Sequence, residues 1–117
     1  LKDLTDADMN VIGVDVRDFP CKLGSGPIVV YQDVTGQYSR RFSDRLLATA
    51  RRIDVPVQRA VFQNYGSDGA SLIRRGVECA LLTYPTRYTH SPIETVNEDD
   101  LEAAVAMLVA FATEGHP

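Results

Sequence analysis

Short apolar segments alternate with segments of helical periodicity along most of this chain. The apolar segments have the length of buried strands, and the periodic segments place apolar side chains every three or four residues. Such alternation is typical of an α/β fold, a layered sheet with helices on its faces. After residue 27 the sequence predicts a strand over 28–31, a helix over 39–54, a strand over 57–62, a short helix ending at residue 75, a strand over 77–83 and a helix over 98–113.

The first 27 residues predict one further strand and one tight turn. Residues 1–10 are acidic and are expected to form a loop or a frayed end. Residues 11–16 form a short apolar run with a carboxylate, Asp15, near its end, which fits a buried strand. Gly24-Ser25-Gly26-Pro27 then predicts a tight turn before the next strand. The turn lacks the Lys and Ser/Thr of a phosphate-binding loop, so nothing beyond a turn is indicated.

The helices carry local start and stop signals. Asn97 is the expected N-cap of the last helix, with Asp100 three residues on as its capping-box partner. The predicted apolar stripe of that helix is Leu101, Ala104, Val105, Leu108 and Ala112. Ser67 or Asp68 is the expected N-cap of the short helix, and Gly76 is its expected stop.

Composition limits the class of protein. The 117 residues suffice for one small domain, and 44% apolar with 24% charged residues predicts a packed core. The formal net charge of -4 argues against nucleic acid as a main partner, because a phosphate-tracking surface needs a basic excess. No apolar run approaches the ~20 residues that span a bilayer, and the acidic start is not a signal peptide. We therefore expect no nucleic acid partner and no membrane partner.

The cysteines and the first residue add two expectations. Cys21 and Cys79 form no CxxC unit and no zinc-ribbon pattern. Reduced, partly buried thiols in a cytoplasmic protein are the simplest interpretation. The chain starts at Leu1 and not at Met, which suggests a piece of a longer or trimmed protein.

Three candidate functional groups follow predicted strands. Asp15 ends the first strand, Asp68 lies in the turn after residues 57–62, and His90 lies in the loop 85–94. Ligands gather at the carboxyl ends of strands in layered sheets, so we expect the three groups to converge at one sheet edge. Carboxylate and imidazole form a partial ligand set for zinc or another divalent metal, although a catalytic zinc takes three protein ligands. Alternatively, the loop is only a connection whose prolines set its path.

Other residues leave alternatives open or point to no chemistry. Glu94 has two interpretations, since it could accept a hydrogen bond from a ligand amine or pin its own loop. Ser25 has neither the flanking pattern of a nucleophile elbow nor a convincing Asp-then-His order downstream. The candidate metal ligands are Asp15 and His90, and the candidate substrate-binding residues are Asp68 and Glu94.

Three motifs occur in a characteristic order. They are Ile12–Val16 with the turn Gly24–Pro27, then Gly66-Ser67-Asp68-Gly69, then Pro85-Thr86-Arg87-Tyr88-Thr89-His90-Ser91-Pro92-Ile93-Glu94. Together they resemble the carboxy-terminal part of the family 42 metallo-aminopeptidases, the glutamyl, deblocking and tetrahedral aminopeptidases, some of them named endoglucanases. The family usually writes the last motif Pro-x-Arg-Tyr-x-His-Ser-Pro-x-Glu, which is quite specific. The likeness covers nearly the whole chain.

The resemblance implies that residues 1–117 are the C-terminal segment of a zinc-peptidase-like (phosphorylase/hydrolase-like) catalytic domain, with the upstream half and the dimerisation domain absent. It implies two divalent metal ions, zinc or cobalt, in the complete enzyme, one bound by Asp15 and the other by His90. A metal-activated water would remove N-terminal residues from peptide substrates. The general-base Glu is expected upstream, so this chain should carry no catalytic residue and be inactive alone. A homo-oligomer is also implied.

Small departures from the family pattern and the missing ligands leave a second hypothesis. Ser67 replaces the usual Thr, Gly69 the usual Ala, and residues 18–21 replace a more typical segment. The changes at Ser67 and Gly69 are mild, whereas the segment 18–21 affects the expected substrate pocket. Because the other ligands are absent, the alternative is a non-enzymatic α/β domain used for assembly or binding.

Overall fold

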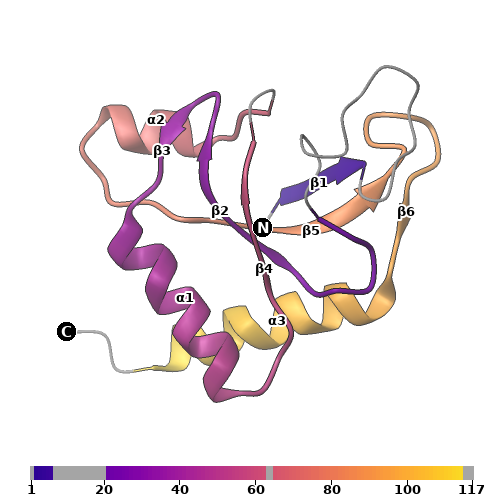
Figure 1. Cartoon of the computed structure of the whole chain (residues 1–117). Coiled ribbons are helices and arrows are strands. Elements are labelled where there is room, and N and C mark those ends of the chain that lie inside the picture. The colour runs from indigo at the N-terminus through magenta and orange to yellow at the C-terminus, as the bar shows by residue number, and fades with distance from the viewer. Residues whose placement is uncertain (1, 7–20, 63–64, 115–117) are drawn as a thin grey trace.

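The computed structural model describes residues 2–6, 21–62 and 65–114. The strands are β1 (Lys2–Asp6), β2 (Ile28–Asp33), β3 (Gly36–Gln37), β4 (Gln58–Val61), β5 (Leu81–Arg87) and β6 (Thr95–Val96). The helices are α1 (Arg40–Arg52), α2 (Gly69–Arg74) and α3 (Glu98–Thr113). Figure 1 shows their arrangement, which confirms the predicted α/β class. The strand predicted over 11–16, and Asp15 with it, lies outside the described residues.

The central strand is β2. It pairs in parallel with β4 and antiparallel with β5, and β1 joins the other side of β5 in parallel. The short strands β3 and β6 fold back, antiparallel, from the ends of β2 and β5. The described residues therefore form a mixed, six-stranded sheet. Ile28, Val29 and Val30 are 0% exposed, as expected for an apolar run that is covered on both faces.

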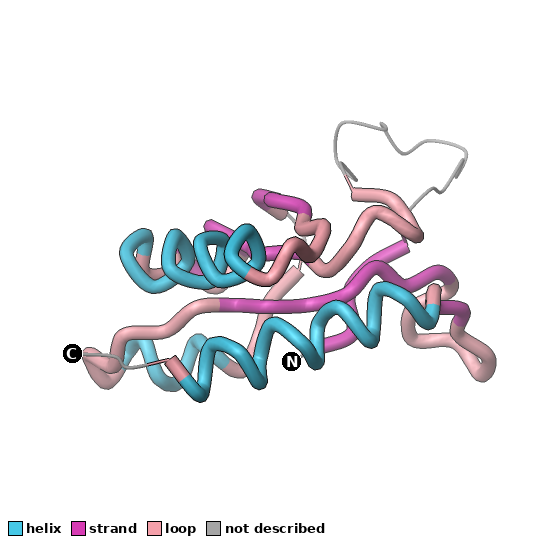
Figure 2. The backbone as a smooth tube through the Cα atoms, turned by 90° about the horizontal axis from the view of Figure 1, so that it is seen from below, coloured by secondary structure: helices cyan, strands magenta, loops and turns pink. Residues whose placement is uncertain are grey.

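Helices cover both faces of the sheet. Successive side chains of β2 point to opposite faces, so they enter two separate hydrophobic clusters. Val29 packs with Leu47 and Met107 on the face covered by α1 and α3. Ile28 and Val30 pack on the other face, in the cluster that Ile73 of α2 adjoins. Figure 1 shows α1 and α3 in the lower half of the molecule and α2 at the upper left, beside β3, and Figure 2 gives the view from below.

Two strand predictions are wrong. Residues 1–10, expected to be a loop or a frayed end, contain β1. The strand expected over 77–83 begins at Leu81 and continues to Arg87, into the stretch expected to be a loop. Its extension is paired on both sides, because Pro85 faces Leu4 of β1 and Arg87 faces Thr95 of β6. The proline indicates a loop from local preference, but the partner strands decide its conformation.

Helix α3 has the predicted bounds, but its buried face differs from the predicted stripe. Ala104 is buried as expected, whereas Val105 and Leu108 are 54% and 38% exposed and Met107 is buried instead. After Glu102 the helix is apolar on nearly every side, so periodicity alone cannot identify the face that packs on the sheet. No helix in the described ranges combines the length and the apolar character needed to cross a membrane.

The predicted capping box at the start of α3 is also wrong. Asn97 caps the helix, because its side chain accepts a hydrogen bond from the N–H of Asp99 at 2.9 Å. Asp100 instead binds the turn before β2. Its Oδ2 accepts from Gly24 N and its Oδ1 from Gly26 N, each at 2.8 Å, and the residue is 1% exposed. The glycine turn is therefore an anion-binding turn that an internal carboxylate occupies.

The same turn requires glycine at its second glycine position. Gly26 has a φ of +98°, and a Cβ there would lie 2.2 Å from the carbonyl oxygen of Pro56. The connection after α1 therefore contacts the turn directly. At the end of α2, Gly76 has a φ of +75°, which confirms it as the predicted stop.

Candidate functional site

The candidate loop, residues 88–94, joins β5 to β6 and contains His90. Its ends are held together because Arg87 faces Thr95 in the antiparallel ladder. Tyr88 and His90 each have a φ of +64°, in the left-handed region that residues other than glycine rarely adopt. Such conformations persist only where the surrounding structure holds them, and they concentrate at functional sites.

Hydrogen bonds within the loop hold this conformation. The N–H of His90 donates to Glu94 Oε1 at 2.7 Å. The hydroxyl of Ser91 lies 2.6 Å from the carbonyl oxygen of Tyr88 and 2.8 Å from that of Ile93, and can donate to either. Of the two interpretations of Glu94, the structure thus contains the contact that pins the loop. Its part in substrate binding stays a prediction.

The side chain of His90 is exposed. Its imidazole makes no hydrogen bond or ion pair with the described part of the chain. Among these residues, no group of three or more His, Cys, Asp or Glu side chains could hold a metal ion. Because Asp15 lies outside the described ranges, the predicted pair of metal ligands is represented here by His90 alone.

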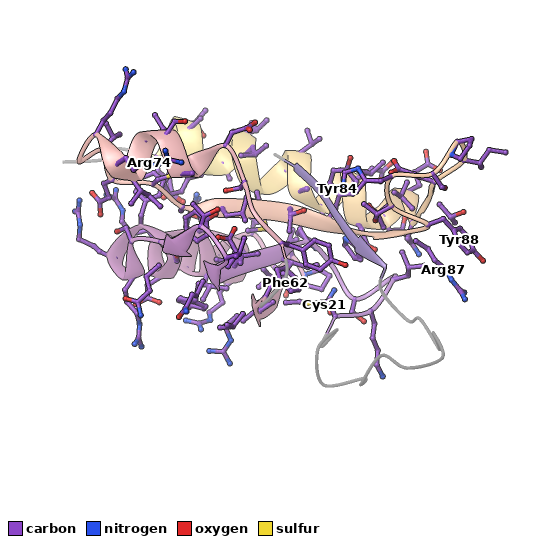
Figure 3. All side chains as sticks on the ribbon, turned by 90° about the horizontal axis from the view of Figure 1, so that it is seen from above. Cys21, Phe62, Arg74, Tyr84, Arg87 and Tyr88 are labelled. Atoms are coloured by element: carbon purple, nitrogen blue, oxygen red, sulfur yellow. The ribbon has the colours of Figure 1, made fainter. Side chains whose placement is uncertain are left out.

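Buried polar atoms lie directly beside the loop. Thr86 Oγ1 and Arg87 Nε are buried and have no hydrogen-bond partner within residues 2–6, 21–62 and 65–114. The guanidinium carbon of Arg87 lies 5.2 Å from the centroid of the Tyr88 ring, and Figure 3 shows these two side chains together at one end of the molecule. Buried polar groups usually have partners. The C-terminal end of β5 is therefore polar, and these two atoms lack hydrogen-bond partners among the described residues.

Asp68 lies at the other end of β5. It lines a cavity with residues 79–82, at the start of this strand, whereas His90 follows the end of the strand. The expectation that Asp68 and His90 converge at one sheet edge is wrong. Strands bring their carboxyl ends to one edge only when they are parallel. Asp68 follows β4, which is parallel to β2, whereas His90 follows β5, which is antiparallel to β2, with Ile28 facing Thr83.

The residues around Asp68 settle the predicted cap of α2. Asp68 occupies the N-cap position, but its exposed side chain makes no capping hydrogen bond. The hydroxyl of Ser67 accepts a hydrogen bond from the N–H of Gly69 at 3.2 Å, so Ser67 provides the side-chain partner for one N–H group in the first turn of α2. The proposed contact between Asp68 and substrate stays a prediction.

A buried cluster of hydroxyl and carboxylate groups adjoins this cavity, whose volume is about 170 Å³. The hydroxyl of Tyr38 donates to Asp33 Oδ2 and shares a hydrogen bond with Ser67 Oγ. The N–H of Thr35 donates to Asp33 Oδ1 at 2.8 Å. Burial and, second, the hydrogen bond to Asp33 raise the pKa of Tyr38 to about 12. Sequence reasoning missed this cluster, because a stretch expected to be a loop gives no signal that its side chains meet.

The two cysteines are free thiols, as predicted. Cys21 is 3% exposed, and burial raises the pKa of its thiol to about 12. Cys79 is half-buried, and burial raises its pKa as well. Neither thiol is therefore activated as a nucleophile.

Comparison with known proteins gives one consistent result. A family model described as M42 glutamyl aminopeptidase matches residues 6–107. An aminopeptidase from the archaeon Desulfurococcus kamchatkensis is 28% identical, with a TM-score of 0.86, and the match covers 97% of this chain and 33% of that one. The TET1 peptidase of Pyrococcus horikoshii, described as able to assemble into a tetrahedron or a large octahedral shell, is 30% identical, with a TM-score of 0.74. That match covers 81% of this chain and 28% of the peptidase.

Similarity to curated sequences agrees with these matches. A protein of Acetivibrio thermocellus is 32% identical over 90 residues, which cover 75% of this chain and 27% of the relative. The chain thus spans between about a quarter and a third of the length of the relatives it matches.

Proposed function

The chain belongs to the M42 glutamyl aminopeptidase family, and on this basis we propose that it is part of a metal-dependent aminopeptidase that removes N-terminal residues from peptides. The family match over residues 6–107 carries the proposal. Because the chain spans only about a third of its relatives, the proposed activity is that of a protein in which this chain is combined with the rest of the catalytic domain.

His90 is the proposed metal ligand within the described residues. Its imidazole is exposed and makes no hydrogen bond to them, so a ring nitrogen is available to bind a metal ion. Its backbone is held at a φ of +64° by the hydrogen bond to Glu94, which limits the directions in which the ring can point. Asp15 is the second proposed ligand.

The described residues fit a metal centre in part. Two divalent ions, zinc or cobalt, would polarise the scissile carbonyl and lower the pKa of a bound water when present. His90 offers a free imidazole, but the described ranges hold no group of three donors. We therefore assign the remaining ligands and the general base to residues outside these ranges.

Of the two proposed substrate contacts, Glu94 is the better placed. It lies in the same loop as His90, and accepting the backbone N–H of His90 occupies only Oε1. Its carboxylate is exposed and negatively charged, which suits the ammonium group of a peptide N-terminus. Asp68 lies at the opposite end of β5, so it would contact a different part of a bound peptide or of the assembly.

The test is the substitution His90→Ala in a protein that combines this chain with the rest of an M42 catalytic domain. We expect a loss of at least about a hundredfold in the hydrolysis of an aminoacyl-p-nitroanilide, because removing a first ligand exceeds the 10–100-fold effect of removing its supporting groups. Elemental analysis should show less bound metal per chain. His116→Ala, at the only other histidine in the sequence, is the control and should change neither quantity. Full activity with His90→Ala would exclude this role.

A non-enzymatic α/β domain for assembly or binding is the second candidate. It is favoured by the absence, among the described residues, of a three-donor group for a metal ion. In either case we propose a homo-oligomer, in line with the assembly described for the P. horikoshii relative. The two candidates are compared in the protein that combines this chain with the rest of an M42 catalytic domain. A folded oligomer of that protein with neither bound metal nor peptidase activity would support the second candidate, whereas near-stoichiometric zinc or cobalt with peptide hydrolysis would support the first.

A further inference from the structure

Helix α1 carries a concentration of positive charge that contrasts with the rest of the chain. Its 13 residues include five arginines and one aspartate, a formal charge of +4 in a chain whose net charge is -4. At about 100° per residue, the five arginines fall within roughly 140° of the helix circumference, away from the side that packs on the sheet. They form a surface here called the arginine face, whose members are Arg40, Arg41, Arg45, Arg51 and Arg52.

The acidic groups near the arginine face leave it open to other partners. Ion pairs join the face to Asp44, Glu78 and Glu114. Ion pairs between exposed side chains contribute little to stability, so acidic groups of another molecule can compete for these arginines. Arg51 is exposed and forms no ion pair with the described residues.

A groove of about 560 Å³ lies in the arginine face beside the end of α3. Its lining residues are Arg45, Ala48, Thr49, Arg52 and Glu114. Burying guanidinium groups against an apolar surface is costly, whereas a carboxylate binds them through charge-assisted, often paired hydrogen bonds. The arginine face therefore suits a partner that presents acidic side chains.

Negative charge is concentrated in the last quarter of the sequence. Residues 88–117 contain six acidic residues and neither Lys nor Arg. Three of these residues are exposed at the start of α3 and form a surface here called the acidic face: Glu98, Asp99 and Glu102. Asp100, buried against the glycine turn, does not belong to it.

The two faces lie too far apart to neutralise each other within one chain. Helix α1 meets α3 near the end of α3, where Phe42 packs against Phe111 and Arg52 pairs with Glu114. At a rise of 1.5 Å per residue, Glu98 lies about 20 Å along the helix from Phe111. This is about twice the screening length in 0.1 M salt. Figure 1 shows α1 at the left of the molecule and the start of α3 at the right, next to β6.

We propose that the arginine face of one chain binds the acidic face of a second copy of this chain. Contact between two arginine faces, or between two acidic faces, would place like charges together, so the interface joins unlike faces. Each copy carries both faces and can therefore contact its neighbours through both. This inference rests on the homo-oligomer proposed above, and it uses neither the His90 loop nor the proposed metal ligands.

Charge reversal tests the proposal in the protein that combines this chain with the rest of an M42 catalytic domain. One variant carries Arg40→Glu and Arg51→Glu, which make the arginine face acidic. The other carries Glu98→Lys and Glu102→Lys, which make the acidic face basic. Sedimentation velocity at low salt should show that each variant alone needs an at least about tenfold higher concentration to assemble than the wild type.

Recovery of assembly is the decisive result. An equimolar mixture of the two variants should assemble like the wild type, and so should a protein with all four substitutions, because unlike charges again meet across the contact. A variant that fails to fold cannot recover in this way. Arg74→Glu with Arg75→Glu, at the exposed end of α2, is the control for the change in net charge and should assemble like the wild type. Assembly of the wild type should weaken as NaCl rises from about 0.05 M to about 0.5 M.

Each other outcome has a definite reading. Assembly that responds to neither salt nor charge reversal would overturn the proposal and leave the homo-oligomer intact. Loss of assembly that neither the mixture nor the fourfold variant restores would also overturn it. So would binding of a DNA duplex that Arg40→Glu with Arg51→Glu abolishes while assembly is unchanged, because the face would then belong to nucleic acid.

Hydrolysis of an aminoacyl-p-nitroanilide in the same samples separates this inference from the proposed activity. Recovered assembly without hydrolysis would contradict the peptidase and leave the interface standing. Hydrolysis by a protein that stays monomeric at all concentrations would overturn the interface and leave the peptidase standing. If the combined protein does not fold, the same variants and mixture are compared in the 117-residue chain, with the same readings.

Discussion

Tyr38 links three segments of the chain through one hydroxyl group. It donates to Asp33 at the end of β2 and shares a hydrogen bond with Ser67 before α2. Tyr38 and Asp33 are 5% and 4% exposed, so water has little access to replace the hydrogen bond between them. Removing the hydroxyl leaves a buried carboxylate with one hydrogen bond fewer.

Tyr38→Phe is therefore expected to reduce the free energy of unfolding by about 1–3 kcal/mol at neutral pH. It should also change the dependence of stability on pH. The folded state raises the pKa of Tyr38 from 10.0 to about 12, so its contribution is complete below pH 10 and is lost as the pH rises towards 12. Cys21, with a pKa raised to about 12, adds a similar loss, so the substitution should make the decline shallower without abolishing it.

Urea unfolding at several pH values between 9 and 12 measures this effect. Tyr88→Phe is the control, because it removes a phenol from a half-exposed side chain in the loop. If the free energy of unfolding falls with pH as steeply in Tyr38→Phe as in the wild type, the buried hydroxyl of Tyr38 does not contribute to the pH dependence of stability.

At the scale of elements, Asp100 ties the start of α3 to the turn before β2. Both carboxylate oxygens are used, one on Gly24 and one on Gly26, over a sequence separation of more than 70 residues. The turn precedes the fully buried residues of β2, and α3 follows β6 directly. One buried side chain thus couples the central strand to the segment that leads out of the His90 loop.

Asp100→Asn is expected to reduce the free energy of unfolding by about 1–3 kcal/mol, since the amide can accept only one of the two N–H groups and leaves the other buried without a partner. Amide hydrogen exchange at Gly24 and Gly26 should become faster. Asp99→Asn, in the same helical turn but exposed, is the matched control and should stay within about 0.5 kcal/mol of wild type. Equal effects of the two substitutions would rule out the proposed tie.

For the whole molecule, the described sheet has an open edge at β4. Within the described residues this strand pairs only with β2, and its Val61 is 54% exposed. Unpaired edges with apolar side chains are sites of association between chains.

We expect the 117-residue chain in isolation to associate as its concentration rises. Val61→Lys should weaken this association, because a charged side chain at an edge opposes pairing. Val34→Lys is the control, since Val34 is 68% exposed but lies in the turn between β2 and β3. Sedimentation velocity over a range of concentrations makes the comparison. A highly stable, monodisperse monomer would contradict the prediction.

Part of this fold was predictable because its signals are local. The α/β class follows from the alternation of apolar runs and helical periodicity, and the bounds of α3 follow from Asn97 and the run after it. Gly76 ends α2 through its own backbone freedom. The loop that carries His90 was identified from neighbouring residues in one motif, and the contact of Glu94 with that loop was one of two interpretations left open.

The remaining features depend on residues far apart in the sequence. The extension of β5 is decided by β1 and β6, the partner of Asp100 lies in the turn 24–26, and the separation of Asp68 from His90 follows from antiparallel pairing. The sequence by itself therefore determined the α/β class, the three helices, the cap at Asn97, the stop at Gly76 and the candidate loop, because interactions within a few residues specify them. Only the tertiary structure decided which strand pairs with which, which face of α3 is buried and which buried carboxylate meets which N–H groups, because such choices depend on the packing of the whole core.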